Sequence, residues 1–117
     1  MVFEMRIEIK KNGAVIITFH TMNKFDSNYE RSKFFRELHG WKQTVPQNNK
    51  RYEYHRKGLL DEVPHIKVAD SVFIVAMQNM KRMMNFFDEW SEKVEYDMTN
   101  VMLEREKMRK LLDNRNI

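Results

Sequence analysis

The 117-residue sequence contains no cysteine. Disulfide bonds, thiolate zinc sites and cysteine nucleophiles are therefore excluded, and the composition is typical of a protein from a reducing compartment. Glycine and proline are also scarce, with three and two residues respectively. This scarcity argues against a disordered or linker-rich chain. We expect a single folded domain.

Long apolar runs are missing as well. No stretch approaches the roughly 18 apolar residues that a membrane span requires. The first ten residues, Met1–Lys10, alternate apolar and charged side chains and lack the apolar segment of a secretory signal. We therefore expect a cytoplasmic protein that has no membrane partner.

Known catalytic motifs are also absent. The sequence has no glycine-rich phosphate-binding loop and no nucleophile elbow. Asp26 and Glu30 are explained more simply as acidic residues at a helix N-terminus than as metal ligands. The sequence favours a non-enzymatic protein without a metal or a cofactor. The four histidines share no i, i+4 spacing of the kind found in metal sites: His20, His39, His55 and His65.

The N-terminal third predicts a β-hairpin followed by a helix. Val2–Lys10 alternates apolar and charged residues, Asn12-Gly13 is a preferred two-residue turn, and Ala14–Phe19 is the expected partner strand. A helix is expected from a cap at Asp26, Ser27 or Asn28 to about Leu38, with Gly40 as its C-cap.

A second hairpin is predicted from Trp41–Val45 and Arg51–Lys57. Alternation places Tyr52, Tyr54 and Arg56 on one face of the second strand. The charged residues Arg51, Glu53, His55 and Lys57 lie on the other face. Two interpretations are open. The one we favour packs the tyrosine face in the core and leaves the charged face in solvent; the other has bases stack on the rings of Trp41, Tyr52 and Tyr54.

A short helical turn at Leu59-Leu60 precedes a buried central strand. That strand is expected within Ile66–Ala76, whose last five residues form a continuous apolar run. Asp70-Ser71 marks a turn or a bulge inside the segment.

Everything from Met77 onward predicts one long, methionine-rich amphipathic helix. Such a helix would be roughly 55 Å long, which exceeds the width of a domain of this size. It therefore breaks near Asp97–Asn100, or it projects and pairs with another chain as a coiled coil. The predicted heptad seam is formed by Met80, Met84, Phe87, Ser91, Val94, Met98, Val101, Arg105, Met108 and Leu112.

Together these elements predict an α+β fold. An antiparallel or mixed sheet of about four to five strands, built from the two hairpins and the central strand, is covered by one short helix and the long C-terminal helix. Residues 1–92 are expected to form the core and residues 93–117 a helical extension for oligomerisation or docking. Its oligomerisation residues are Val94, Met98, Val101, Met108 and Leu112.

The positive charge of the chain is concentrated in one segment. The net charge is +4, yet the eight basic and eight acidic residues from Met77 to Ile117 cancel. Between Arg31 and Lys57 the only acidic residues are Glu37 and Glu53. A cluster of this kind attracts polyanions. The candidate phosphate-contacting residues are Arg31, Lys33, Arg36, Lys42, Lys50, Arg51, Arg56 and Lys57.

The leading hypothesis is a non-enzymatic, homodimeric protein that binds DNA or RNA through the basic hairpin and the first helix. The alternative is a non-catalytic subunit or adaptor that docks on a protein partner through its methionine-rich C-terminal helix. A third hypothesis, ranked below these two, is a small endoribonuclease that uses His55 or His65.

Overall fold

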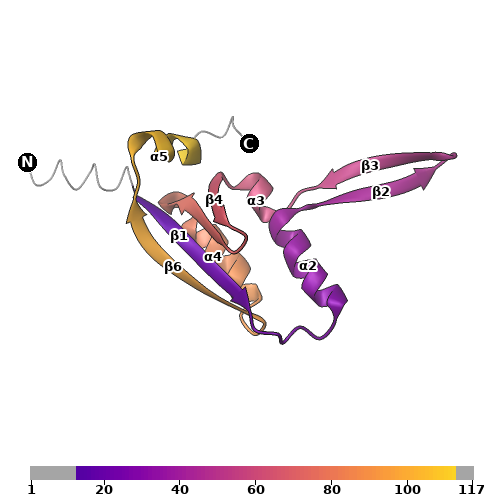
Figure 1. Cartoon of the computed structure of the whole chain (residues 1–117), viewed down its shortest axis with the longest axis horizontal. Coiled ribbons are helices and arrows are strands. Elements are labelled where there is room, and N and C mark those ends of the chain that lie inside the picture. Colours follow the sequence, from indigo (N-terminus) through magenta and orange to yellow (C-terminus); the bar gives the residue numbers. More distant parts are fainter. Residues whose placement is uncertain (1–12, 113–117) are drawn as a thin grey trace, which may run out of the picture. The chain divides into compact units, whose positions relative to one another are not determined.

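The computed structural model describes residues 13–112. These residues form an α+β fold with six antiparallel strands and four α-helices (Figure 1). The predicted α+β class is therefore confirmed, whereas the predicted helices match only in part. The chain divides into two compact units: the first joins the residues up to Lys24 to those from Pro64 onward, and the second is the continuous segment Phe25–Val63.

The first unit contains a four-stranded antiparallel sheet in the order β4-β5-β1-β6. The predicted strand Ala14–Phe19 is present within β1. Its partners among the described strands differ from the one expected. Both edges of β1 are occupied, one by β5 and the other by β6. Val2–Lys10 lies outside the described residues. The strands are β1 (Gly13–Thr21), β4 (His65–Ala69), β5 (Val72–Ala76) and β6 (Val94–Met102).

The segment Ile66–Ala76 is two strands rather than one. The chain reverses at Asp70-Ser71, so β4 and β5 pair as an antiparallel hairpin. Aspartate and serine favour turns because their side chains hydrogen-bond to nearby backbone. The predicted burial of the apolar run is confirmed, since four of the five β5 residues are buried.

The predicted long C-terminal helix is wrong. Its segment forms a 3-10 turn η1 (Met77–Asn79), helix α4 (Met80–Glu89), strand β6 and helix α5 (Arg105–Leu112). Residues 93–117 therefore begin with a strand and not with a helical extension. β-Branched and aromatic residues such as Tyr96 and Thr99 favour a strand, and β6 pairs with β1 along its whole length.

The heptad seam does not line one helical surface. Val94 lies in β6 and Met108 in α5, and both are buried in this chain. Met98 and Val101 are half-buried strand residues, whereas Leu112 is exposed at the end of α5. The seam that motivated a coiled coil is thus absent, and the oligomeric state stays a prediction.

Helix α4 covers one face of the sheet with aromatic side chains. The ring of Phe87 lies 5.4 Å from that of Phe19 on β1 and 5.1 Å from that of Tyr96 on β6, measured between centroids. The Tyr96 hydroxyl donates a 2.6 Å hydrogen bond to Asp88, which raises the pKa of Tyr96 to about 12. These contacts hold α4 against β1 and β6.

Helix α5 packs on the opposite face of the same sheet. Its residues Met108 and Leu111 are buried with Ala14, Ile74 and Ala76. Successive strand residues point to opposite faces. The adjacent residues Phe73 and Ile74 of β5 are both buried, one on each face of the sheet. The sheet of the first unit therefore has apolar residues on both faces.

The second unit consists of α2 (Asn28–His39), β2 (Trp41–Gln47), β3 (Lys50–Arg56) and α3 (Leu59–Glu62). Ser27 caps α2 because its hydroxyl accepts a 3.1 Å hydrogen bond from the Glu30 N–H. Gly40 ends α2 with a positive φ of 81° and donates its N–H to the Arg36 carbonyl. The predicted helix, its C-cap and the short turn at Leu59 are confirmed.

The aromatic packing of the first unit predicts a large loss of stability for Phe87→Ala. Phe87 is fully buried, so truncation should lower the free energy of unfolding by about 3–5 kcal/mol. Urea unfolding followed by circular dichroism measures this change. The control is Lys81→Ala on the exposed side of α4, which should cost less than about 0.5 kcal/mol. Equal effects of the two substitutions would contradict this packing.

Candidate functional site

The second hairpin is an isolated two-stranded sheet. β2 and β3 pair from Trp41 opposite Arg56 to Gln47 opposite Lys50. The turn residues Asn48 and Asn49 both have positive φ, 53° and 64°. Asparagine tolerates this left-handed conformation better than most residues, and two such residues in succession fit the tight turn favoured by the twist of a hairpin. The predicted strands Trp41–Val45 and Arg51–Lys57 left residues 46–50 as a loop, but pairing continues to Gln47 and Lys50, so the connection is a two-residue turn.

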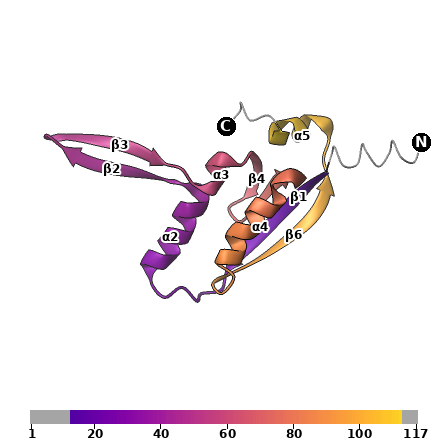
Figure 2. The ribbon, with the colours of Figure 1, turned by 180° about the vertical axis from the view of Figure 1, so that it is seen from behind.

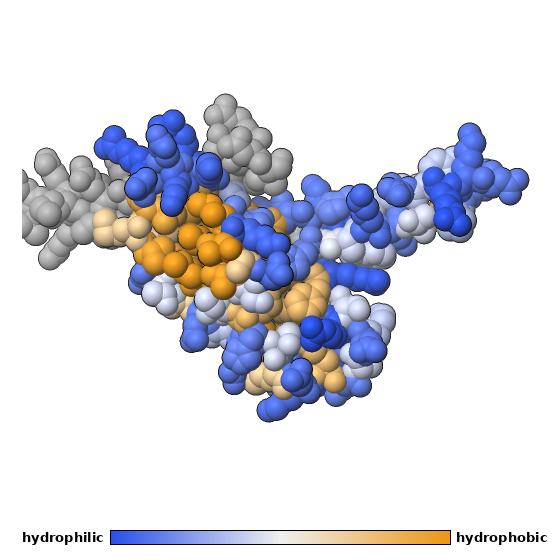
Figure 3. Space-filling view, viewed as in Figure 1, coloured by the Kyte–Doolittle hydropathy of each residue, from blue (hydrophilic) through white to orange (hydrophobic). Residues whose placement is uncertain are grey.

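The hairpin is exposed along its length. Every residue of β3 is exposed, and β2 alternates between half-buried and exposed residues. Figures 1 and 2 show the two strands extending beyond α2 and α3 as an arm. We call Trp41–Lys57 the arm. In Figure 3 its surface is mostly blue and white, the colours of hydrophilic and neutral residues.

The expected burial of the tyrosine row is wrong. Tyr52 is 41% exposed and Tyr54 is 44% exposed. The prediction assumed that the hairpin joins the main sheet and turns one face to the core, but β2 and β3 pair only with each other among the described strands. Both faces of the arm therefore reach solvent.

The two faces of the arm differ in chemistry. Directly paired residues project to the same side of a sheet, so the strand register assigns each side chain to a face. The first face carries all three aromatic residues of the arm and no carboxylate; the second carries Glu53. The aromatic face consists of Trp41, Gln43, Val45, Gln47, Lys50, Tyr52, Tyr54 and Arg56, and the polar face of Lys42, Thr44, Pro46, Arg51, Glu53 and His55.

Arginine side chains are held against the aromatic face. The Arg36 guanidinium of α2 lies 4.4 Å from the ring centroid of Trp41. Arg56 lies 5.5 Å from the ring centroid of Tyr54, and its Nε donates a 2.6 Å hydrogen bond to Gln43. Guanidinium groups are attracted to the electron-rich faces of aromatic rings. These contacts, which the sequence did not reveal, restrict the arginines before any ligand binds.

All eight predicted cationic residues lie in the second unit. Helix α2 carries Arg31, Lys33 and Arg36, and the arm carries the other five. Arg31 lies over the ring of Phe35 at 5.2 Å. The remaining seven form no ion pair with any carboxylate between residues 13 and 112. These are Lys33, Arg36, Lys42, Lys50, Arg51, Arg56 and Lys57.

A small cleft lies between α2 and the base of the arm. It has a volume of about 200 Å³ and is lined by three cations, one carboxylate and two aromatic residues. The cations make this cleft suited to an anionic group such as a phosphate. Sequence reasoning identified its cations but not Tyr29 or Glu37 as their neighbours. The lining residues are Tyr29, Lys33, Arg36, Glu37, Trp41 and Lys57.

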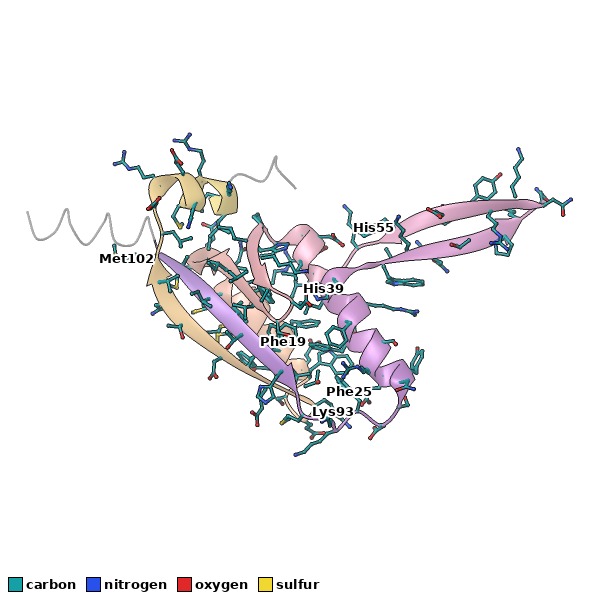
Figure 4. The ribbon with its side chains drawn as sticks, viewed as in Figure 1. Phe19, Phe25, His39, His55, Lys93 and Met102 are labelled. Carbon is teal, nitrogen blue, oxygen red and sulfur yellow. The ribbon has the colours of Figure 1, made fainter. Side chains whose placement is uncertain are left out.

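Asp61 fastens the base of the arm to α3. Its Oδ2 accepts a 2.8 Å hydrogen bond from the Gly58 N–H and lies 2.9 Å from Nε2 of His55. Figure 4 shows His55 at the end of β3 that is nearer to α3. Partial burial alone would raise the pKa of Asp61, but the Gly58 hydrogen bond, His55 and the charge of Lys57 together lower the pKa below its usual value.

The four histidines do not form a common site. His55 pairs with Asp61 in the second unit, whereas His65 belongs to the first unit and contacts Phe73. His20 pairs with Glu95 at 3.1 Å, and the ring of His39 stacks on Phe35. Within the described part of the chain no three histidine or acidic side chains are grouped to hold a metal ion.

The lowered pKa of Asp61 predicts a pH-dependent contribution to stability. This contribution is present above the ordinary aspartate pKa of about 3.9 and is lost as the pH falls through the lower folded-state pKa. Asp61→Asn should therefore cost about 1–2 kcal/mol at pH 7, because it removes a charged hydrogen-bond acceptor. Urea unfolding at pH 7 and at pH 2 measures the difference, which should shrink at the lower pH.

Asp70→Asn is the matched control for this substitution. Asp70 is almost fully exposed in the β4–β5 turn and pairs only with the exposed Lys67. An exposed pair contributes about 0–1 kcal/mol, so the control should change stability little at either pH. A cost of Asp61→Asn that is equal at both pH values would contradict the role assigned to the carboxylate.

Between residues 13 and 112 no helix combines the length and the apolar character needed to cross a membrane. No protein-family model, curated protein or solved structure matches the chain. A function must therefore be argued from the chemistry of the arm, α2 and the cleft between them.

Proposed function

We propose that the protein binds nucleic acid without catalysing a reaction, and that the arm and α2 contact the phosphates. The observation that supports this proposal is the exposed arm itself. Five of its side chains are cationic, only Glu53 is acidic, and none of the five cations is ion-paired with a described carboxylate. Cations without an ion-pair partner on an exposed arm can contact a polyanion without first breaking a salt bridge.

Phosphate neutralisation supplies the driving force in this proposal. Each cation that contacts a phosphate releases condensed counterions from the nucleic acid, which makes binding favourable at low salt and weaker as salt increases. Backbone contacts of this kind carry little information about sequence. We therefore propose a binder with weak sequence preference that contacts either DNA or RNA.

The adaptor hypothesis loses the element on which it was based. It required one exposed, methionine-rich C-terminal helix, but this segment contains α4, β6 and α5, and Met83 and Met108 are buried within the first unit. The endoribonuclease hypothesis, which used His55 or His65, stays a prediction as well. A homodimer would present two arms and increase avidity, and it stays a prediction.

The proposal predicts the effect of removing two phosphate contacts from the arm, one beside its turn and one in the cleft. Lys50→Gln/Lys57→Gln should lower affinity for every oligonucleotide. It should also reduce the slope of log K against log salt by about 1.8 on duplex DNA or about 1.4 on single strands. Fluorescence anisotropy at a series of salt concentrations measures both quantities.

Lys107→Gln/Lys110→Gln is the matched control. Both lysines are exposed on α5 of the first unit, and the double variant removes the same net charge without altering the arm. Its salt slope should equal that of the unmodified protein. Equal slopes for both double variants would show that net charge, and not the arm, governs binding. The absence of salt-sensitive binding by the unmodified protein would refute the proposal.

A further inference from the structure

We infer that the nucleic acid is single-stranded and that its bases stack on Tyr52 and Tyr54 of the aromatic face. This inference rests on the proposed function and names the ligand of the same arm. Tyr52 and Tyr54 are both more than two-fifths exposed, on a hairpin that pairs with no other described strand. Exposed rings on a cationic surface are typical of proteins that bind unpaired nucleotides.

The distinction from a duplex follows from the accessibility of the bases. In a double helix the face of each base is covered by its neighbours, so a protein reaches only the base edges and the phosphates. A single strand can turn its bases outward onto aromatic side chains. Duplex binding would make use of the cations but would leave Tyr52 and Tyr54 without a role in contacting the ligand.

The spacing of the tyrosines fits a stacked single strand. Tyr52 and Tyr54 are two residues apart on one face, and a strand rises about 3.4 Å per residue, so their Cα atoms lie about 7 Å apart. This separation is about twice the rise of roughly 3.4 Å per nucleotide in a stacked strand. Each ring can therefore receive its own base, and one further base fits between them.

The neighbours of Tyr54 support the same interpretation. Arg56 lies over its ring and is anchored by Gln43. The guanidinium thus places a positive charge over one face of the ring, and a base would stack on the other face with its flanking phosphate near this charge.

The aromatic face leads into the cleft at the base of the arm. Trp41 belongs to both, and Arg36 stacks on its ring. A strand that passes over Tyr52 and then Tyr54 reaches the cleft next, where Lys33 and Lys57 also surround the available space. Glu37 is the single carboxylate there, so the cleft keeps a net positive charge. We assign the cleft to a backbone phosphate of the same single strand.

A structural role for the tyrosines is the competing explanation. Two-stranded hairpins are marginally stable, and cross-strand pairs such as Tyr52 with Val45 stabilise them. That role requires a bulky side chain with high strand propensity but does not require a flat ring. Isoleucine retains the strand propensity, whereas phenylalanine retains the ring. The two substitutions therefore separate the explanations.

The test uses the full chain and three fluorescent probes of about 12 nucleotides. They are a single-stranded oligonucleotide of mixed sequence, its duplex, and a single strand of equal length without bases. Anisotropy at one low salt concentration should show the tightest binding to the single strand with bases. Tyr52→Ile/Tyr54→Ile should weaken that binding by roughly five- to 150-fold per ring. The same variant should bind the strand without bases as the unmodified protein does.

Tyr52→Phe/Tyr54→Phe is the control, and it should keep the affinity of the unmodified protein. Equal binding of the unmodified protein to strands with and without bases would overturn the inference, as would tighter binding to the duplex. Neither result needs a variant that folds. An unchanged affinity of the isoleucine variant, together with weaker binding by Lys50→Gln/Lys57→Gln, would also overturn it while leaving the proposed function intact. The absence of binding to all three probes would instead remove the proposed function.

Discussion

The close approach of Gly40 and Gly58 determines where the arm begins. A Cβ atom on Gly58 would collide with the backbone of His39 and Gly40, and one on Gly40 would collide with the Arg56 carbonyl and the Asp61 carboxylate. Two chain segments thus meet where only glycine fits. Because Asp61 also binds the Gly58 N–H, both strands of the arm leave the helices from a fixed junction. Beyond this junction every β3 residue is exposed.

In the proposed function, the first unit supplies stability and the second unit supplies recognition. In the first unit, aromatic side chains from α4 and the sheet pack closely, and no buried side-chain polar atom of the described residues lacks a hydrogen-bond partner. The arm has no comparable core, and its aromatic residues lie on a surface that faces solvent. Arginines stacked on Trp41 and Tyr54 reduce the conformational freedom that binding would otherwise have to remove. The arm is therefore preorganised although it is exposed.

Local patterns in the sequence predicted local structure well. The first helix begins after Ser27 and ends at Gly40, as expected. Both strands of the second hairpin lie where the alternation of residues predicted them. The prediction of a long C-terminal helix failed because the pattern is ambiguous. Val94, Met98 and Val101 fit a heptad, but Val94, Tyr96 and Met98 also fit the alternation of a strand. Pairing with β1 favours the strand. The sequence of residues 94–102 alone does not reveal that this partner strand is available. The exposure of Tyr52 and Tyr54 was missed for the same reason, since it depends on which strands adjoin the hairpin.

A nuclear magnetic resonance titration of the full chain tests the central claim most directly. A single-stranded oligonucleotide of about 12 nucleotides is added while the backbone amide shifts are followed. The proposal predicts that the largest changes occur in the arm, residues 41–57, and at Lys33 and Arg36 of α2, with small changes in β1, β5 and β6. Changes centred on the first unit, or no change at any residue, would contradict the claim that the arm binds nucleic acid.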